Sequence, residues 1–502
     1  MQAVAAFDDR FIEDSKTENA LASVALALAT GGDRRIFADP VSGRNRYGTR
    51  VTPAEAEVSF ASTTASNISS AGFRAAGEAL ARLIAPGHPG IAGLGQWFQD
   101  IRHRMAGGLG LSQTDIVLAA SGTDIELIAI ALVTALSARP ITNIVIAPDE
   151  TGSGVPRAAT GCHYSDLTAL GDDVLAGAAI ENMPVSRIET RSVPIRDAMS
   201  RARTAQEIDG EVIDIVEREL KRGRDVLVHL LDTSKTGLSG LTRDAARHVA
   251  RLAPGRVWVI VDACQFRCSF ATIRQDLADG FMVAITGSKF LAGPPFAGAL
   301  LLPAALGFEL TATGDLPSGL QAYSAAQDWP ARVRTAMKFP FRQEANIGLG
   351  LRWVAALEHL DGLSAIEDVR RKAVKEAILG RMRARVDAST SIFLHPEDDG
   401  DHLARSAILP FSIRNHPGGL ANFEKAQAIH AALRDADCGP VCHIGQAVRL
   451  GERAVLRLSV SAPDVIGVAG RLAAGGDLAQ ALQPLEARLD VLFDKLDRVL
   501  SS

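Results

Sequence analysis

The sequence has little of several residue types that mark specialised classes of protein. Its five cysteines are too few for a disulfide framework in a chain of 502 residues. The spacings Cys264–Cys268 and Cys438–Cys442 differ from the usual spacings of zinc ligands, so we expect reduced thiols and no metal site. The net charge is only −5, and no basic stripe is interleaved with aromatic residues, which excludes nucleic acid as a partner.

Long apolar runs are also missing. The most apolar stretch, residues 281–308, is interrupted by Lys289 and by three prolines, which excludes a membrane span there. The first fourteen residues carry four acidic side chains, where a secretion signal would carry basic ones. We therefore expect a cytoplasmic protein that does not bind membranes.

The composition and the order of patterns indicate a globular α/β protein. The chain is 47% hydrophobic and 22% charged, and it is long enough for two or three domains. From residue 115 to 303, strand patterns alternate with helical ones, which predicts a mainly parallel central sheet with helices on both faces. A smaller α+β C-terminal domain is expected to follow. We divide the chain into an N-terminal arm with a small-domain segment (1–75), a large domain (76–325) and a C-terminal small domain (326–502).

The stretch from Val257 to Pro303 carries the strongest chemical signal. An apolar run over 257–261 predicts a buried strand that stops at Asp262, and a second run over 281–285 leads to Lys289. The carboxyl ends of parallel strands form the edge where open α/β sheets bind ligands, so this carboxylate and this lysine are expected at one site. Taken alone, such a pair is more often a helix N-cap and a solvated loop lysine.

The neighbouring residues favour the site. They resemble the fold-type I pyridoxal-phosphate (PLP) enzymes, in the branch of class V aminotransferases and cysteine desulfurases. The family pattern Asp-Ala-x-Gln is similar to Asp262-Ala263-Cys264-Gln265, and Ser-x-His-Lys is similar to Thr286-Gly287-Ser288-Lys289. The resemblance implies PLP as cofactor, Lys289 as the Schiff-base lysine, Asp262 beside the pyridine nitrogen, and a homodimer with sites at the subunit interface.

The resemblance also implies the remaining cofactor contacts. A strand over 115–119 leads into a turn of small residues and an apolar helix, a geometry that favours a phosphate at the helix start, although a plain N-cap has the same pattern. Ser234 stands where the family has an asparagine, and Ser288 where it has a histidine. The implied cofactor-binding residues are Ser121, Gly122, Thr123, Ser234, Asp262, Gln265, Thr286, Ser288 and Lys289.

Substrate contacts are expected from the small domain. Leu456-Arg457-Leu458-Ser459 resembles the family's Val-Arg-x-Ser strand, which implies that Arg457 grips a substrate carboxylate. The alternative for Arg457 is an edge-strand arginine that faces solvent. His443 and the arginine-rich loop 43–50 are candidate specificity elements, although a loop of this kind is more often a solvated surface loop. Residues 59–70 resemble the family segment that lines the mouth of the site.

Several positions depart from the family pattern. Thr151 stands where an aromatic residue or a histidine stacks on the cofactor ring, which leaves His163 as a candidate for that role. Ala345 replaces a threonine that reaches the partner's phosphate. Residues 164–205 make the chain longer than usual there, and we interpret them as an inserted lobe. Ile444 occupies the position of the desulfurase nucleophile, and Cys442 lies two residues too early, which argues against cysteine desulfuration.

The sequence therefore predicts a PLP-dependent enzyme that acts on an amino acid through an external aldimine. A class V-type aminotransferase is the first choice. A PLP-dependent lyase or a decarboxylative carbon–carbon bond enzyme is the alternative within the same chemistry. A non-catalytic protein with the PLP fold is the alternative of another class, because Thr151, Ser234, Ser288 and Ala345 all depart from the pattern.

Overall fold

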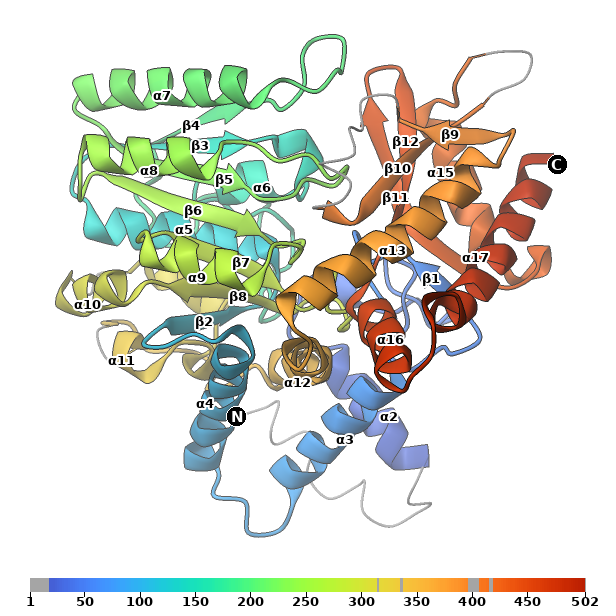
Figure 1. Cartoon of the computed structure of the whole chain (residues 1–502). Helices are drawn as coiled ribbons and strands as arrows, with labels where there is room; N and C mark the ends of the chain where they lie inside the picture. Colours follow the sequence, from blue (N-terminus) through green and yellow to red (C-terminus); the bar gives the residue numbers. More distant parts are fainter. Residues whose placement is uncertain (1–17, 314–315, 335–336, 396–405, 415–418, 502) are drawn as a thin grey trace.

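The computed structural model describes residues 18–313, 316–334, 337–395, 406–414 and 419–501. A seven-stranded sheet forms the large domain, in the order β2-β8-β7-β6-β5-β3-β4 (Figure 1). Strands β7, β6, β5, β3 and β4 are parallel, and β8 runs antiparallel to both β2 and β7, which confirms a mainly parallel sheet. The strands are β2 (Asp115–Ala119), β3 (Ile141–Ile146), β4 (Ile188–Val193), β5 (Asp225–Leu231), β6 (Val257–Ala263), β7 (Met282–Thr286) and β8 (Gly298–Leu302).

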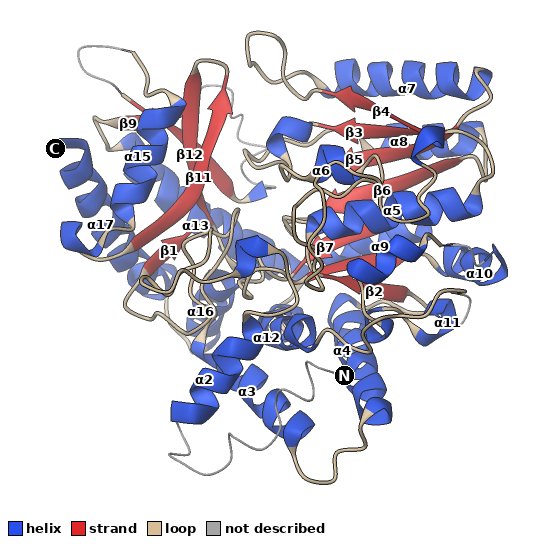
Figure 2. Ribbon diagram, turned by 180° about the vertical axis from the view of Figure 1, so that it is seen from behind, coloured by secondary structure: helices blue, strands red, loops and turns tan. Residues whose placement is uncertain are grey.

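Helices cover both faces of this sheet, so β3, β5, β7 and β8 are buried along their whole length. One face carries α7 (Ala205–Lys221), α8 (Arg243–Leu252) and α9 (Phe270–Ala278) (Figure 1). The other face carries α5 (Gly122–Leu136), with α6 (Val155–Ala158) and α10 (Ala304–Thr313) packed on it (Figure 2). The carboxyl ends of the parallel strands point toward the small domain, which places the predicted site between the two domains (Figure 1).

The small domain is built on a five-stranded sheet in the order β1-β11-β12-β10-β9. Strand β1 comes from the N-terminal segment and pairs in parallel with β11, so the two ends of the chain share one sheet. Its strands are β1 (Val58–Phe60), β9 (Ile392–Leu394), β10 (Ile408–Ile413), β11 (Cys442–Leu450) and β12 (Arg453–Ser459). Its helices are α13 (Asp368–Asp387), α15 (Phe423–Leu433), α16 (Ala462–Ala473) and α17 (Leu478–Ser501).

One long helix joins the two domains. Helix α12 (Ile347–Ser364) lies at their junction (Figure 1) and contacts α2 (Glu18–Leu28), α3 (Ser70–Ile84), α4 (Ile91–Leu109) and α16. Its Arg352 is fully buried and donates hydrogen bonds to the carbonyl oxygens of Leu28, Gly31 and Phe296. The guanidinium therefore ties the N-terminal arm to the large domain.

Three expectations about local structure were wrong. Residues 188–193 do not belong to a separate lobe, because they form the edge strand β4, parallel to β3. Strand β6 continues to Ala263, so Asp262 lies inside the strand and not just after it. The glycines of residues 87–95 predict a break between helices, but helix α4 begins at Ile91 within this stretch, because packing against α12 outweighs the low helix propensity of glycine.

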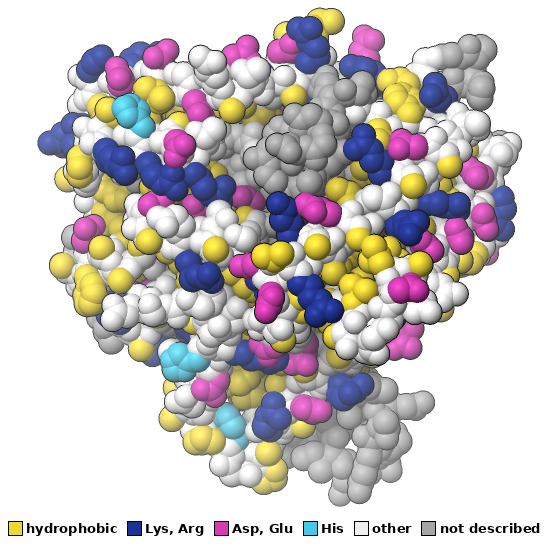
Figure 3. All heavy atoms as spheres, in the orientation of Figure 1, with side chains coloured by type: hydrophobic (Ala, Val, Ile, Leu, Met, Phe, Trp, Pro, Cys, Tyr) yellow, Lys and Arg dark blue, Asp and Glu magenta, His cyan; other side chains and the backbone are white. Residues whose placement is uncertain are grey.

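Three further findings concern the surface, the helices and the side chains that could bind a metal ion. On the face drawn in Figure 3, Lys and Arg side chains are interspersed with Asp and Glu, in keeping with the small net charge of −5. None of the helices in the described ranges combines the length and the hydropathy that a bilayer crossing requires. Likewise, no group of His, Cys, Asp and Glu side chains in those ranges could hold a metal ion.

Candidate active site

The predicted acid and the predicted lysine come from neighbouring strands of the large sheet. Asp262 on β6 pairs with Leu231 of β5 and Ala284 of β7, so it is flanked by strands on both sides. Its Oδ1 accepts the backbone N–H of Cys264 at 3.0 Å, and no helix begins there. Thr286 Oγ1 donates to the Cys264 carbonyl at 2.6 Å, which ties the end of β7, three residues before Lys289, to the end of β6. The two strand ends therefore form one edge.

The turn before α5 lies against this edge. Ser121 is the N-cap of the helix, because its Oγ accepts the N–H of Asp124 at 3.3 Å. The first-turn amides of Gly122 and Thr123 have no acceptor within their own helix. A Cβ at Gly122 would lie 3.0 Å from Cys264 Sγ, so a larger residue would press on this thiol. The structure thus brings the predicted phosphate turn beside the residues that follow Asp262.

Arg457 is buried between the domains. It is 1% exposed, and β12 lies between β11 and β10, so the alternative of a solvent-facing edge arginine was wrong. Its Nη1 donates to the Lys235 carbonyl at 3.0 Å, and its Nη2 donates to the Gln446 carbonyl at 2.6 Å and to Thr64 Oγ1 at 3.2 Å. Burial lowers the pKa of Arg457 to about 10. No carboxylate in the described ranges lies within ion-pair distance of this guanidinium.

The N-terminal segment 59–70 supplies polar groups to the same region. Gln265 Nε2 donates to the Thr63 carbonyl at 3.1 Å, and both side chains are buried. Gln265 Oε1 and Thr63 Oγ1 have no hydrogen-bond partner among the described residues. Thr64 binds Arg457, as given above. Buried polar atoms without a partner are rare, so these two mark a place that a ligand would complete.

Sequence reasoning missed Lys235, which follows β5 in the turn Asp232-Thr233-Ser234-Lys235. Burial, with the like charges of Arg457 and Lys289, lowers the pKa of Lys235 to about 8. Its backbone N–H donates to the Glu150 carbonyl at 3.0 Å, and the hydroxyl of Ser234 donates to Glu150 Oε2 at 2.8 Å. The available signal was the position of this lysine, which follows a strand that ends at the same edge as Asp262.

Other predicted residues have partners of their own. His443 Nε2 lies 2.7 Å from Glu57 Oε2, and Arg44 of the loop 43–50 donates a hydrogen bond to the same carboxylate. Glu57 therefore holds both His443 and the loop in place. His163 stacks on Tyr323, with ring centroids 5.8 Å apart, and its Nδ1 lies 2.6 Å from the Tyr323 hydroxyl. The Thr151 hydroxyl donates to the Pro148 carbonyl at 3.2 Å.

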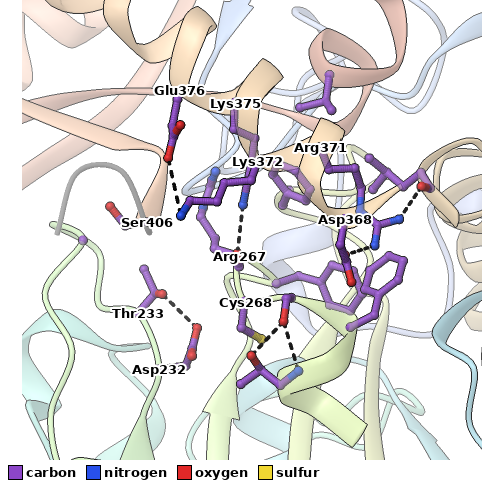
Figure 4. A pocket seen from close by; sticks show the side chains of 18 of the residues that line it. Asp232, Thr233, Arg267, Cys268, Asp368, Arg371, Lys372, Lys375, Glu376 and Ser406 are labelled. Atoms are coloured by element: carbon purple, nitrogen blue, oxygen red, sulfur yellow. Dashed lines mark hydrogen bonds and ion pairs between the residues drawn. The ribbon is translucent and has the colours of Figure 1, made fainter. Parts of the chain in front are cut away.

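A separate cavity of about 690 Å³ lies between the domains, bordered by the ends of β5 and β6 and by α13 (Figure 4). Phe290 lines it and the adjacent Lys289 does not. In Figure 4, Asp232, Thr233 and Cys268 face Arg371, Lys372, Lys375 and Glu376 of α13. We refer to it below as the α13 cavity.

Comparisons with known proteins support the fold. No family model matches the chain, and no curated protein matches it. Oryza sativa TDC, solved with PLP and tryptamine, is 14% identical with a TM-score of 0.52, over 88% of this chain and 82% of that chain. A NifS-like protein is 12% identical with a TM-score of 0.51, over 89% and 99% of the two chains. The Escherichia coli cysteine desulfurase CsdA is 15% identical with a TM-score of 0.51, over 89% and 95%. These likenesses show the fold and confirm the predicted fold class.

Proposed function

We propose that this chain is a PLP-dependent enzyme that acts on an amino acid, with Lys289 as the residue that holds the cofactor. The observation that carries the proposal is the convergence of Lys289, Lys235 and Arg457 on the edge that holds Asp262, without a carboxylate partner in the described part of the chain. A ligand with a phosphate and a carboxylate would supply the missing negative charges. Oryza sativa TDC, which shares the fold, was solved with PLP.

The residues present fit this cofactor. The unpartnered Gln265 Oε1 and Thr63 Oγ1 provide hydrogen-bonding capacity beside Asp262. The amides of Gly122 and Thr123 at the start of α5 can hold a phosphate, as helix N-termini do. The residues that we propose to hold PLP remain Ser121, Gly122, Thr123, Ser234, Asp262, Gln265, Thr286, Ser288 and Lys289.

Each side chain has a defined task in this proposal. When bound, PLP supplies a protonated ring that withdraws electrons from the substrate Cα. The carboxylate of Asp262 keeps the proton on the ring nitrogen. Arg457 binds the substrate carboxylate and thereby fixes the orientation of Cα. Lys289, once the substrate amine has replaced it, accepts or returns the proton at Cα as a general base and acid.

The reaction we propose is amino-group transfer, in which Lys289 moves a proton between two carbon atoms. Its support is the resemblance of Asp262-Ala263-Cys264-Gln265 and Thr286-Gly287-Ser288-Lys289 to the motifs of class V aminotransferases. Carbon dioxide release is the second candidate, and its support is the likeness to Oryza sativa TDC with tryptamine, an amine that lacks a carboxylate. Desulfuration has no such support, because Ile444 occupies the nucleophile position and Cys442 is buried, with its Sγ 3.4 Å from the Pro440 carbonyl oxygen.

The test is an absorbance titration of the purified protein with PLP, followed by a panel of L-amino acids and product analysis. We expect a visible cofactor band that one amino acid removes and a 2-oxo acid restores, with the amino group transferred. Release of carbon dioxide would establish the second candidate. No band at any PLP concentration would overturn the proposal. A Lys375→Ala variant in the α13 cavity serves as the matched control and is expected to keep the band. The resemblance further predicts a homodimer, which light scattering checks.

A further inference from the structure

Three buried polar side chains lie behind Asp262 on the face of the sheet that α5 covers. They are Asn143 on β3, His229 on β5 and Glu126 on α5, with exposed fractions of 0%, 3% and 2%. His229 pairs with Ile260, two residues before Asp262 on β6, so the His229 and Asp262 side chains lie on the same face. Burial, reinforced by the negative charge of Asp262, raises the pKa of Glu126 well above its ordinary value.

The orientation of Asn143 fixes the direction of the hydrogen bonds between these three side chains. Asn143 Nδ2 donates to the Ala159 carbonyl at 3.0 Å, and a carbonyl oxygen only accepts, which fixes the orientation of the amide. Asn143 Oδ1 then faces His229 Nε2 at 2.8 Å and accepts its proton. A neutral imidazole therefore has a bare Nδ1, which needs a donor.

Glu126 is the group that lies at this nitrogen. Its Oε2 is 3.3 Å from His229 Nδ1, and no N–H or O–H donor in the described ranges forms a hydrogen bond to it. Glu126 can donate only if it carries a proton. The opposite assignment, an imidazolium beside a carboxylate, conflicts with burial, which lowers the pKa of His229 to about 3. It would also place two negative carboxylates side by side.

The two carboxyl groups differ in what stabilises a negative charge. Asp262 is half-buried, and its Oδ1 accepts the N–H of Cys264 at 3.0 Å. In contrast, no group in the described ranges donates a hydrogen bond to Glu126 Oε2. The titratable groups that face Glu126 are Asp262 and the Cys264 thiol from the β6 side and His229 from β5. None of them brings a positive charge to Glu126, so nothing around it offsets the cost of burying an ionised carboxylate.

We propose that Glu126 is a neutral carboxylic acid that donates to His229 Nδ1, and that it is a positioning residue which keeps a second negative charge away from Asp262 beneath the proposed ring nitrogen. This inference rests on the proposed function only for the role of Asp262. Glu126 carries its proton in the cofactor-free protein as well. The protonation of Glu126 and the proposed PLP-dependent function can therefore be refuted independently.

The test is an infrared difference spectrum between the cofactor-free parent and Glu126→Gln. The amide keeps the shape and can donate to His229, so the expected difference is the loss of one protonated-carboxyl band. The matched control is Glu219→Gln, because Glu219 is equally buried, at 1% exposed, but lies 2.8 Å from Arg222 and 3.6 Å from Arg224. Because two guanidinium groups face the Glu219 carboxyl, its substitution is expected to remove no such band. A parent without the Glu126 band would overturn the proposal.

Two further readouts test the claim, and the first uses the parent alone, so it remains available if a variant does not fold. Nitrogen NMR of the parent should show His229 neutral, protonated on Nε2 and bare on Nδ1; an imidazolium would overturn the proposal. As the pH rises above about 4.3, the unfolded chain loses the Glu126 proton while the folded chain keeps it, so the parent should lose stability relative to Glu126→Gln. The same stability difference at every pH would contradict the assignment. These signals without any PLP binding would refute the proposed function and leave the proton on Glu126 in place.

Discussion

Two polar regions border the ends of β5 and β6, and they differ in how they neutralise their cations. In the α13 cavity, Arg243 lies 2.9 Å from Asp232, Arg371 pairs with Asp368, and Lys372 lies 3.9 Å from Glu376 (Figure 4). Lys375 and Arg267 are exceptions there, since both donate to backbone carbonyl oxygens. In the candidate active site, Lys289, Lys235 and Arg457 have no acid partner in the described ranges.

This difference indicates which of the two regions is expected to bind an anionic ligand. A cation that already has an internal acid gains little from an anionic ligand. A buried cation without one has lost its hydration and regains stabilisation only when a ligand brings the negative charge. The active-site edge, and not the α13 cavity, is therefore the expected place for a phosphate and a carboxylate.

The largest expected effect comes from Lys289. Lys289→Ala should lower turnover by about 10²–10⁴-fold or more, because it removes the general base together with the cofactor attachment. Steady-state kinetics on the best amino acid measures this. Lys372→Ala, on the wall of the α13 cavity, is the control and should keep parental turnover. Equal losses in both variants would erase the distinction between the two regions.

The next effect concerns Arg457. Arg457→Lys should raise KM for the amino acid by about 10²-fold, because a lysine cannot reproduce a bidentate grip on a carboxylate. Arg352→Lys is the matched control, since Arg352 is equally buried and bound to carbonyl oxygens but lies at the domain junction. It should lower the melting temperature and leave KM unchanged. A KM that responds to both variants would show a general structural role.

A smaller effect is expected from the protonation of Lys235. Its pKa of about 8 means that it is charged below that pH and neutral above it. If the charge helps to bind the carboxylate, KM of the parent rises as the pH passes through this value. Lys235→Arg should keep KM flat to about pH 10, because arginine stays protonated. The pH profiles of KM for the two proteins check this, and parallel profiles would exclude Lys235 from binding.

The smallest effect is expected in the α13 cavity. Asp368→Asn breaks the pair with Arg371, but Asp368 is 46% exposed, so solvent already screens the interaction. The free energy of unfolding should fall by no more than about 1 kcal/mol, with unchanged amino-acid kinetics. Urea denaturation measures the first quantity. A kinetic effect larger than the stability effect would indicate that the cavity takes part in the reaction.

The sequence predicted the elements whose signal is local. The patterns at 115–119 and 225–231 predict strands that match β2 and β5, because each is a short, mostly apolar run that begins at an aspartate. Strand β1 has only three residues and exists because it pairs with β11, almost 400 positions away, so no local pattern could indicate it. Strand β4 was missed for a related reason, since its middle residues are polar and only partly buried.

The same division applies to the site. Asp262, Gln265 and Lys289 stand in a motif, so the sequence names them directly. The environment of Lys235, Glu126 and His229 comes from residues that are distant in the chain, such as Arg457 beside the Lys235 carbonyl. Their altered pKa values arise from burial, which appears only when the sheet and the small domain are assembled.

The most direct test of the central claim is to locate the cofactor on the chain. The protein is loaded with PLP, the carbon–nitrogen bond between lysine and cofactor is reduced with borohydride, and the peptides are analysed by mass spectrometry. We predict that the label lies on Lys289 and on no other lysine. A label on Lys235, or on the cavity residues Lys372 and Lys375, or no label at all, would contradict the account.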